Sequence, residues 1–200
     1  MDTVPGTAGN DTFVAADHNK VTTSLNEIFG LGDDINGGAG TDTLTVLGDG
    51  ALGSIQFAKF ASVEKANLTS DTAAGANQNV DLTSLVAGGL TDVTVDAGNT
   101  ITLQNLAKAV NVGVKGAALA GDTGVTFEFD DATTTADAIN LSLNAATVGA
   151  AGQRAINTMA VNGAAGIETV NVAAEGVSNV QLNSGNTMTT LNIAATGRTT

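Results

Sequence analysis

Apolar and polar side chains alternate over short stretches through most of the chain after residue 60. Ile167–Ala174 and Met188–Ala195 repeat one phrase, in which an apolar residue, two variable residues, an apolar residue, Asn and an apolar residue precede small residues. Similar phrases begin at Ile156 and Val177, so successive copies follow one another at a nearly even spacing. A period of two predicts β-strands with one buried face, and the Gly, Asn, Asp, Ser and Thr residues between them favour turns. The pattern therefore predicts an all-β chain.

Helical periodicity is limited to Asn19–Phe29, and Asn105–Ala109 could add one helical turn. In the repeated strands, the apolar members of each phrase should point into the core. The positions expected to point inward include Val93, Val95, Val170, Val172, Leu191 and Ile193.

Two architectures use short strands at this spacing. A β-sandwich needs hairpins and larger core residues, whereas a parallel β-solenoid, or β-helix, stacks similar rungs with two strands in each. The recurrence of the phrase every second strand, after about 21 residues, favours the solenoid over residues 48–200. Asn in the middle of many phrases would then form ladders from rung to rung. The sandwich remains the alternative.

A glycine-rich segment near the N-terminus points to a metal. Gly37–Thr45 fits the pattern G-G-x-G-x-D-x-U-x, a nonapeptide associated with Ca²⁺, at every specified position. Its glycines allow carbonyl groups to turn toward one cation, Asp42 adds a carboxylate, and Leu44 anchors the following strand. Ca²⁺ takes six to eight oxygen ligands, which such a turn supplies without Cys or His.

Two partial copies accompany this motif within residues 1–47, which we interpret as a calcium-binding segment. Gly6–Val14 lacks only the second glycine, and Asp33–Asn36 supplies the second half of a further turn. We expect one Ca²⁺ between Asp33–Asn36 and Gly37–Asp42, and a less secure one at Asp11. The candidate ligands are the carboxylates of Asp33, Asp34, Asp42 and Asp11 and main-chain oxygens near Gly38, Gly40 and Gly9. A glycine-rich hairpin with solvated Asp side chains is the alternative interpretation.

The overall charge narrows the possible partners. The 200 residues carry 20 acidic and 7 basic side chains, for a formal net charge of −13. This argues against nucleic acid, whose phosphates require Lys and Arg, and suits a divalent cation.

The sequence has no Cys, so disulfides are excluded. No apolar run reaches the ~18 residues of a membrane-spanning helix, so membrane insertion is not expected. The N-terminus lacks the basic and apolar regions of a usual signal peptide.

Catalytic candidates are weak. Glu128–Asp131 gathers carboxylates that would suit glycoside hydrolysis, but the chain has neither Trp nor Tyr to stack on a sugar. His18 is the only histidine, so it cannot form a zinc site with a second His or Cys. We therefore expect no catalytic residue and no enzyme.

Gly6–Val14, Gly32–Thr45 and the related phrases at Val63–Leu68 and Ile167–Val172 resemble calcium-dependent bacterial surface-layer (S-layer) proteins with repeats-in-toxin (RTX) motifs. Ala132–Leu143 is similar to a phrase common in such proteins. The resemblance implies an extracellular structural protein that self-assembles into a Ca²⁺-stabilised lattice on the bacterial cell surface and leaves the cell by type I secretion. Its partners would be further copies of itself and a cell-surface polysaccharide bound through parts outside this segment.

Two other functions stay open. The same calcium motifs would suit a secreted repeat adhesin or matrix protein, and parallel β-helices also include polysaccharide-active enzymes. The final residues look like one more repeat without a cap, so we expect this chain to be a fragment of a larger protein.

Overall fold

A computed structural model of the chain describes residues 2–16, 29–69, 78–98, 101–118, 124–130, 132, 136–148, 154–160, 167–184 and 187–196. Short strands dominate these residues, as the period-two pattern predicts. The strands are β1 (Thr3–Pro5), β2 (Thr12–Ala16), β3 (Asp34–Asn36), β4 (Thr43–Leu47), β5 (Lys59–Ala61), β6 (Lys65–Thr69), β7 (Gln78–Asp81), β8 (Asp92–Gly98), β9 (Ile101–Leu106), β10 (Asn111–Ala118), β11 (Gly124–Phe129), β12 (Ala138–Val148), β13 (Arg154–Ala160), β14 (Thr169–Glu175), β15 (Val180–Asn183) and β16 (Thr190–Ala195).

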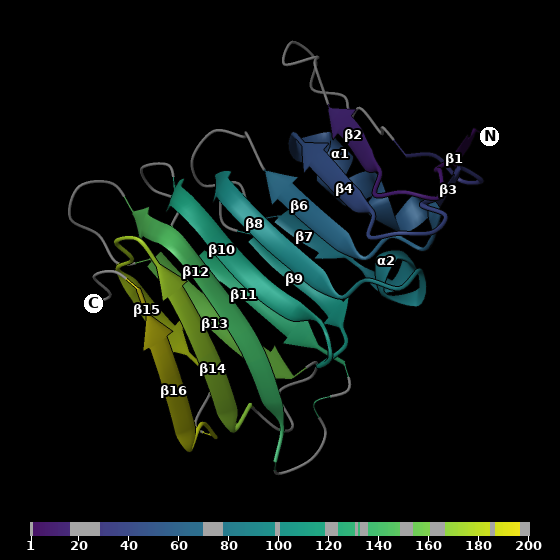
Figure 1. Ribbon diagram of the computed structural model, residues 1–200. Coiled ribbons are helices and arrows are strands. Elements are labelled where there is room, and N and C mark those ends of the chain that lie inside the picture. The colour runs from purple at the N-terminus through teal and green to yellow at the C-terminus, as the bar shows by residue number, and fades with distance from the viewer. Residues whose placement is uncertain are drawn as a thin grey trace.

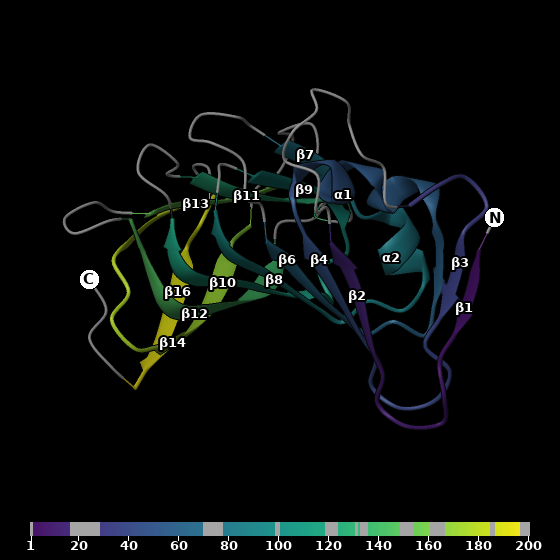
Figure 2. The ribbon, with the colours of Figure 1, turned by 90° about the horizontal axis from the view of Figure 1, so that it is seen from above.

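Alternate strands go to opposite layers. The even-numbered strands form one eight-stranded sheet in the order β16-β14-β12-β10-β8-β6-β4-β2. The odd-numbered strands form a three-stranded sheet, β1-β3-β5, and a five-stranded sheet, β15-β13-β11-β9-β7. Figure 1 shows the neighbouring strands of the eight-stranded sheet side by side, and Figure 2 shows the two layers from above. The pairings between these strands are parallel, for example β2 with β4 and β12 with β14. The parallel β-solenoid is therefore confirmed, and a hairpin-built sandwich is not formed.

Three short helices lie where the odd-numbered layer changes from one sheet to the next. They are α1 (Asp49–Ser54), η1 (Ile55–Phe57) and α2 (Thr83–Ala87), and Leu52, Ile55 and Leu85 anchor them with no exposed surface. The proposed boundary after residue 47 falls just before α1. The eight-stranded sheet continues across it because β4 pairs with β6.

The helical segments expected from the sequence are not present in the described residues. Of Asn19–Phe29, only Phe29 lies within them, so the remainder of that prediction falls outside the described residues. The expected helical turn at Asn105–Ala109 is corrected, because Asn105 belongs to β9 and adopts a left-handed φ of 62°.

The core lies between the layers and is built from the expected face of the strands. Val93, Val95 and Val170 are at most 1% exposed, and Val172 is 6% exposed. Two expected core positions require correction, because Leu191 and Ile193 are 45% and 57% exposed. They are in register with Val170 and Val172 but belong to β16, the last strand of its sheet. With no further rung stacked on them among the described residues, their side chains remain partly in solvent.

The rungs are less regular in length than the repeated phrase predicts. Val170 pairs with Leu191, which is the expected spacing. Val93 pairs with Val112 across a shorter rung, and Ile139 pairs with Val170 across a much longer one. The strands keep register while the connections between them vary in length, because loops at the surface tolerate insertion better than a packed sheet does.

Candidate calcium-binding turns

The complete motif and its first partial copy are separated in sequence but lie side by side in the structure. Pro5 pairs with Asn36 at the end of β1 and β3, and Thr12 pairs with Thr43 at the start of β2 and β4. The turn at 6–11 therefore stacks directly on the turn at 37–42. Main-chain hydrogen bonds join the turns, including one from the N–H of Ala39 to the carbonyl of Thr7 at 3.2 Å.

The glycines of the motif allow this close stacking. A Cβ atom at Gly38, where φ is +93°, would lie 2.2 Å from the Thr7 carbonyl oxygen. At Gly40, where φ is +125°, it would lie 2.7 Å from the Gly9 carbonyl oxygen. Both positions thus require glycine for its conformation and for its lack of a side chain.

Asp42 is the most unusual side chain of these turns, because it is a carboxylate with no exposed surface. Its Oδ1 accepts a hydrogen bond from the main-chain N–H of Asp11 at 2.7 Å. Its own N–H donates to Glu64 Oε2 at 2.8 Å, one rung further along. Among the residues that the structure describes, no hydrogen-bond donor reaches Asp42 Oδ2. This buried oxygen is therefore free to bind a cation.

Comparison with the neighbouring turn explains the unpaired oxygen. Asp11 Oδ2 accepts the N–H of Thr7 at 2.5 Å. The equivalent donor in the next turn is the N–H of Gly38, which donates instead to Asn36 Oδ1 at 3.0 Å. Pro5 occupies the position of Asn36 in the first rung and has no side-chain acceptor. Asn36 therefore removes the donor that would otherwise satisfy Asp42.

Further oxygens surround the first glycine of each turn. A Cβ at Gly37 would lie 1.9 Å from the carbonyl oxygen of Ser62 and 2.3 Å from Asp42 Oδ2. At Gly6 it would lie 2.0 Å from the carbonyl oxygen of Gly37 and 2.8 Å from Asp11 Oδ2. Each rung thus brings the carboxylate of its own turn close to a carbonyl of the next. Carboxylate and carbonyl oxygens are the ligands that a hard cation such as Ca²⁺ prefers.

Side chains alone do not complete a metal site. Within the described parts of the chain, no group of three or more His, Cys, Asp or Glu side chains is placed to hold a metal. A cation here would therefore take most of its ligands from main-chain carbonyls, as the glycine-rich pattern implies.

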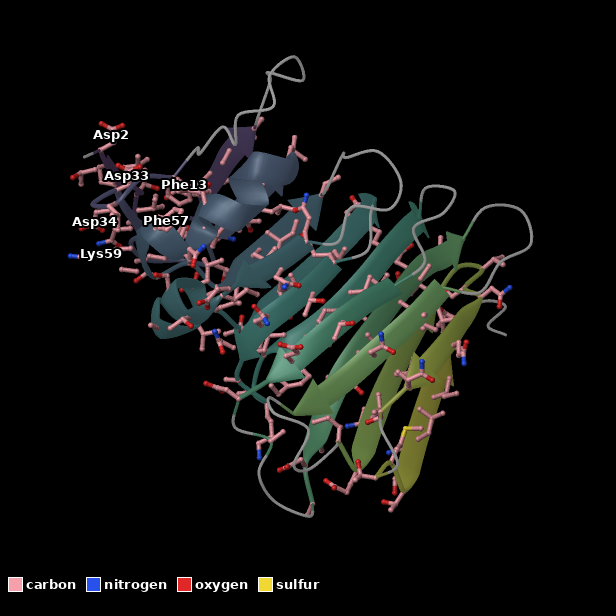
Figure 3. All side chains as sticks on the ribbon, turned by 180° about the vertical axis from the view of Figure 1, so that it is seen from behind. Asp2, Phe13, Asp33, Asp34, Phe57 and Lys59 are labelled. Atoms are coloured by element: carbon pink, nitrogen blue, oxygen red, sulfur yellow. The ribbon has the colours of Figure 1, made fainter. Side chains whose placement is uncertain are left out.

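Asp33 and Asp34 lie away from these turns. The residues after Asp33 run as β3, which separates Asp33 from the turn at 37–42, so the structure does not bring Asp33 and Asp42 into one turn. Figure 3 shows Asp33 and Asp34 near Asp2 and Lys59. Asp33 Oδ2 accepts the N–H of Gly30 at 2.8 Å, and Oδ1 accepts that of Asp2 at 2.9 Å. These hydrogen bonds, from Gly30 first and then Asp2, hold the pKa of Asp33 below its ordinary value.

Glu64 and Ser62 are absent from the ligands expected from the sequence. Both lie next to Asp42 because β4 pairs with β6. Ser62 adopts a left-handed φ of 51°, which is uncommon for a residue other than glycine. The turn at 62–64 carries no glycine, so no motif identifies it as the next member of the stack.

A second buried carboxylate in the chain has a different partner. Asp137 is 1% exposed and precedes β12. Its N–H donates to Glu168 Oε2 at 2.8 Å, as the N–H of Asp42 does to Glu64. Asp137 Oδ1, however, binds the ammonium group of Lys108 at 2.5 Å. The two corners have the same carboxylate arrangement, but a Lys supplies the positive charge in only one of them.

The structure describes only part of the acidic cluster that the sequence offered as a catalytic candidate. Glu128 accepts a hydrogen bond from Gln104 at 2.9 Å and lies on β11. The exposed Asp130 follows the same strand, whereas Asp131 and His18 lie outside the described residues.

Comparisons with family models, with curated proteins and with solved structures find no match to this chain. The fold and the stacked turns therefore define its class, a parallel β-solenoid with a candidate calcium-binding corner. None of the helices described in the structure is long and apolar enough to cross a membrane.

Proposed function

We propose that this protein is a non-enzymatic, calcium-stabilised structural solenoid that self-assembles as part of a bacterial surface layer. The observation that carries the proposal is Asp42, whose carboxylate is fully buried and has one oxygen that no donor reaches among the residues the structure describes. A buried charge without compensation is costly, so such groups are normally paired or coordinate a metal. Bound Ca²⁺ would supply the missing compensation.

The Lys108–Asp137 pair supports this interpretation from within the same chain. In that pair the ammonium group of Lys108 lies 2.5 Å from Asp137 Oδ1 and supplies a positive charge beside the buried carboxylate. Asp42 has a carbonyl-rich environment in place of a Lys. Asp42 and Asp11, with the carbonyl groups of Gly37 and Ser62, are the groups that would hold the ion.

Calcium would stabilise the contacts between rungs at the N-terminal end of the solenoid. Without it, adjacent carboxylates repel each other, and the glycine-rich turns gain much conformational entropy when they unfold. Because an ion that binds only the folded turns stabilises them by mass action, apparent stability should rise with free calcium.

Calcium would also favour self-association through charge screening. Screening of the net charge of −13 by calcium would reduce the repulsion between copies of the chain.

The calcium site is tested by calorimetric titration of the wild type and of Asp42→Asn. Wild type should bind Ca²⁺, and Asp42→Asn should bind at least tenfold more weakly while keeping its strand signal by circular dichroism. Asp130→Asn is the matched control, because its carboxylate is exposed and should not contribute. Asp33→Asn separately tests the ligand expected from the sequence. Equal binding by wild type and Asp42→Asn, or no binding at millimolar calcium, would overturn the calcium proposal.

Self-assembly needs a separate measurement. Light scattering of the full chain should rise with millimolar calcium and fall again when a chelator is added. Magnesium at the same concentration controls for simple charge screening. If scattering stays at the monomer level although calorimetry detects calcium, the lattice role is wrong and the calcium site stands.

A further inference from the structure

We propose that the outer face of the eight-stranded sheet binds a linear, neutral, hydroxyl-rich polysaccharide in a groove that crosses β8, β10, β12, β14 and β16. This inference is independent of the proposed calcium site. The strands involved lie side by side in Figure 1, and the groove contains two adjoining hollows of about 530 and 280 Å³ that share Ser142 and Ala173.

One wall of the groove is a continuous ladder of side-chain hydrogen bonds. Each Asn donates its amide N–H to the residue on the preceding strand, and the chain of bonds ends at the Asp92 carboxylate. The donor–acceptor distances are 3.1 Å for Asn111 to Asp92, 3.0 Å for Asn140 to Asn111, 3.2 Å for Asn171 to Asn140 and 2.9 Å for Asn192 to Asn171.

The ladder leaves hydrogen-bonding groups of each Asn available to a ligand at a regular spacing. A primary amide has two N–H donors and an oxygen with two lone pairs, and each inner Asn uses one of each within the ladder. One donor and one lone pair per Asn remain, repeated at the strand spacing of about 4.8 Å. Because the ladder already holds these amides in place, a ligand would lose little side-chain entropy on binding.

The floor of the groove is smooth and weakly apolar. Ala173 and Ala194 are exposed and line this floor together with Ser142. A Cβ at Gly113 would lie 2.4 Å from Ser142 Oγ, so a side chain there would fill the floor. The C–H face of a sugar ring can lie on such a surface while its hydroxyl groups reach the amides, which is the usual combination in a ligand site.

The opposite wall selects against charged polymers. The Asp96–Lys115 pair, with a nitrogen–oxygen distance of 2.9 Å, is neutral overall, and Glu175 adds a negative charge. Together with Asp92 and the acidic chain as a whole, this disfavours polyanions. Across β10, β12 and β14 an extended peptide is also disfavoured, because each of these strands is paired on both sides and offers no main-chain groups for strand addition.

The absence of Trp and Tyr from the sequence limits the affinity for each sugar. Binding should therefore depend on chain length, because a longer chain spans more members of the ladder. We expect a linear β-linked gluco-oligosaccharide of six units to bind at least fivefold more tightly than the corresponding disaccharide.

The test is titration of the full chain with this hexasaccharide, followed by NMR or calorimetry, with a hexa-uronate and an uncharged peptide of similar length as comparison ligands. Ala173→Leu blocks the floor and Asn140→Ala interrupts the ladder, and each should weaken hexasaccharide binding at least fivefold. Ala155→Leu and Asn157→Ala are matched controls on the five-stranded sheet, where Asn157 takes part in a similar ladder with Thr126 and Asn183. These controls should bind as wild type does.

Three results would overturn the proposal. They are no saturable binding of the hexasaccharide, equal or tighter binding of the hexa-uronate or the peptide, and binding that Ala173→Leu and Asn140→Ala leave unchanged. Each leaves the calcium proposal intact, because the groove residues lie outside the stacked turns.

Discussion

Replacing Lys108 with Met should destabilise the solenoid by about 3 kcal/mol, because it removes the positive charge beside the buried Asp137. The carboxylate side chain of Asp137 is 1% exposed and the side chain of Lys108 is 26% exposed. Breaking a buried ion pair by removing one partner typically costs about 3–5 kcal/mol. The partial exposure of Lys108 favours the lower end of this range. Met keeps much of the length and apolar contact of the Lys stem, so the effect reports mainly the lost charge.

The chain provides a control of the same chemistry at its surface. Lys115 pairs with Asp96 at 2.9 Å, but the two side chains are 54% and 35% exposed. Exposed pairs of this kind contribute about 0–1 kcal/mol. Lys115→Met should therefore change stability by less than about 1 kcal/mol.

Urea unfolding followed by far-ultraviolet circular dichroism is the appropriate assay, because the sequence contains no Trp or Tyr for fluorescence. Free calcium must be the same in all samples, since a bound ion would add its own stabilisation. Adding Asp137→Leu to Lys108→Met should recover part of the loss, because the buried negative charge is then removed as well. The reasoning is refuted if Lys108→Met and Lys115→Met have equal effects, or if Asp137→Leu restores nothing.

Two further predictions concern the core and acid stability. Val170→Ala should cost about 1–3 kcal/mol in unfolding free energy, because Val170 has no exposed surface. Leu191→Ala on the partly exposed last strand should cost under about 1 kcal/mol. Equal losses in urea titrations would contradict this burial argument. For Asp33, the folded-state pKa lies below the ordinary value of 3.8. Its stabilising contribution is therefore complete above that pH and is lost as the pH falls through the folded-state pKa. The stability difference between wild type and Asp33→Asn should accordingly shrink on acidification below about pH 4. A difference that does not vary with pH would show that the ionised form of the Asp33 carboxyl group is not what these main-chain hydrogen bonds stabilise.

The alternation of apolar and polar residues along the sequence was sufficient to predict the fold class. The alternation around Val93, Val95, Val170 and Val172 predicted strands and their buried faces, because the two-residue period of a strand is a local property of the backbone. The parallel solenoid followed from the repetition of similar strands. The same pattern could not distinguish Leu191 and Ile193 from these core residues, since burial depends on whether another rung covers a strand.

Sequence motifs also identified the glycine turn and Asp42, because the conformational freedom of glycine and the ligand preferences of calcium depend on residue type. Sequence proximity, however, paired this turn with Asp33–Asn36. The tertiary structure pairs it with Gly6–Asp11 on one side and Ser62–Glu64 on the other. Rung length decides this arrangement, and it varies because the connections differ in length while the strands keep register. Only the assembled sheets therefore show that Asn36 takes the donor equivalent to Thr7 N–H. Within the described parts of the chain, this leaves one buried oxygen of Asp42 without a hydrogen-bond partner.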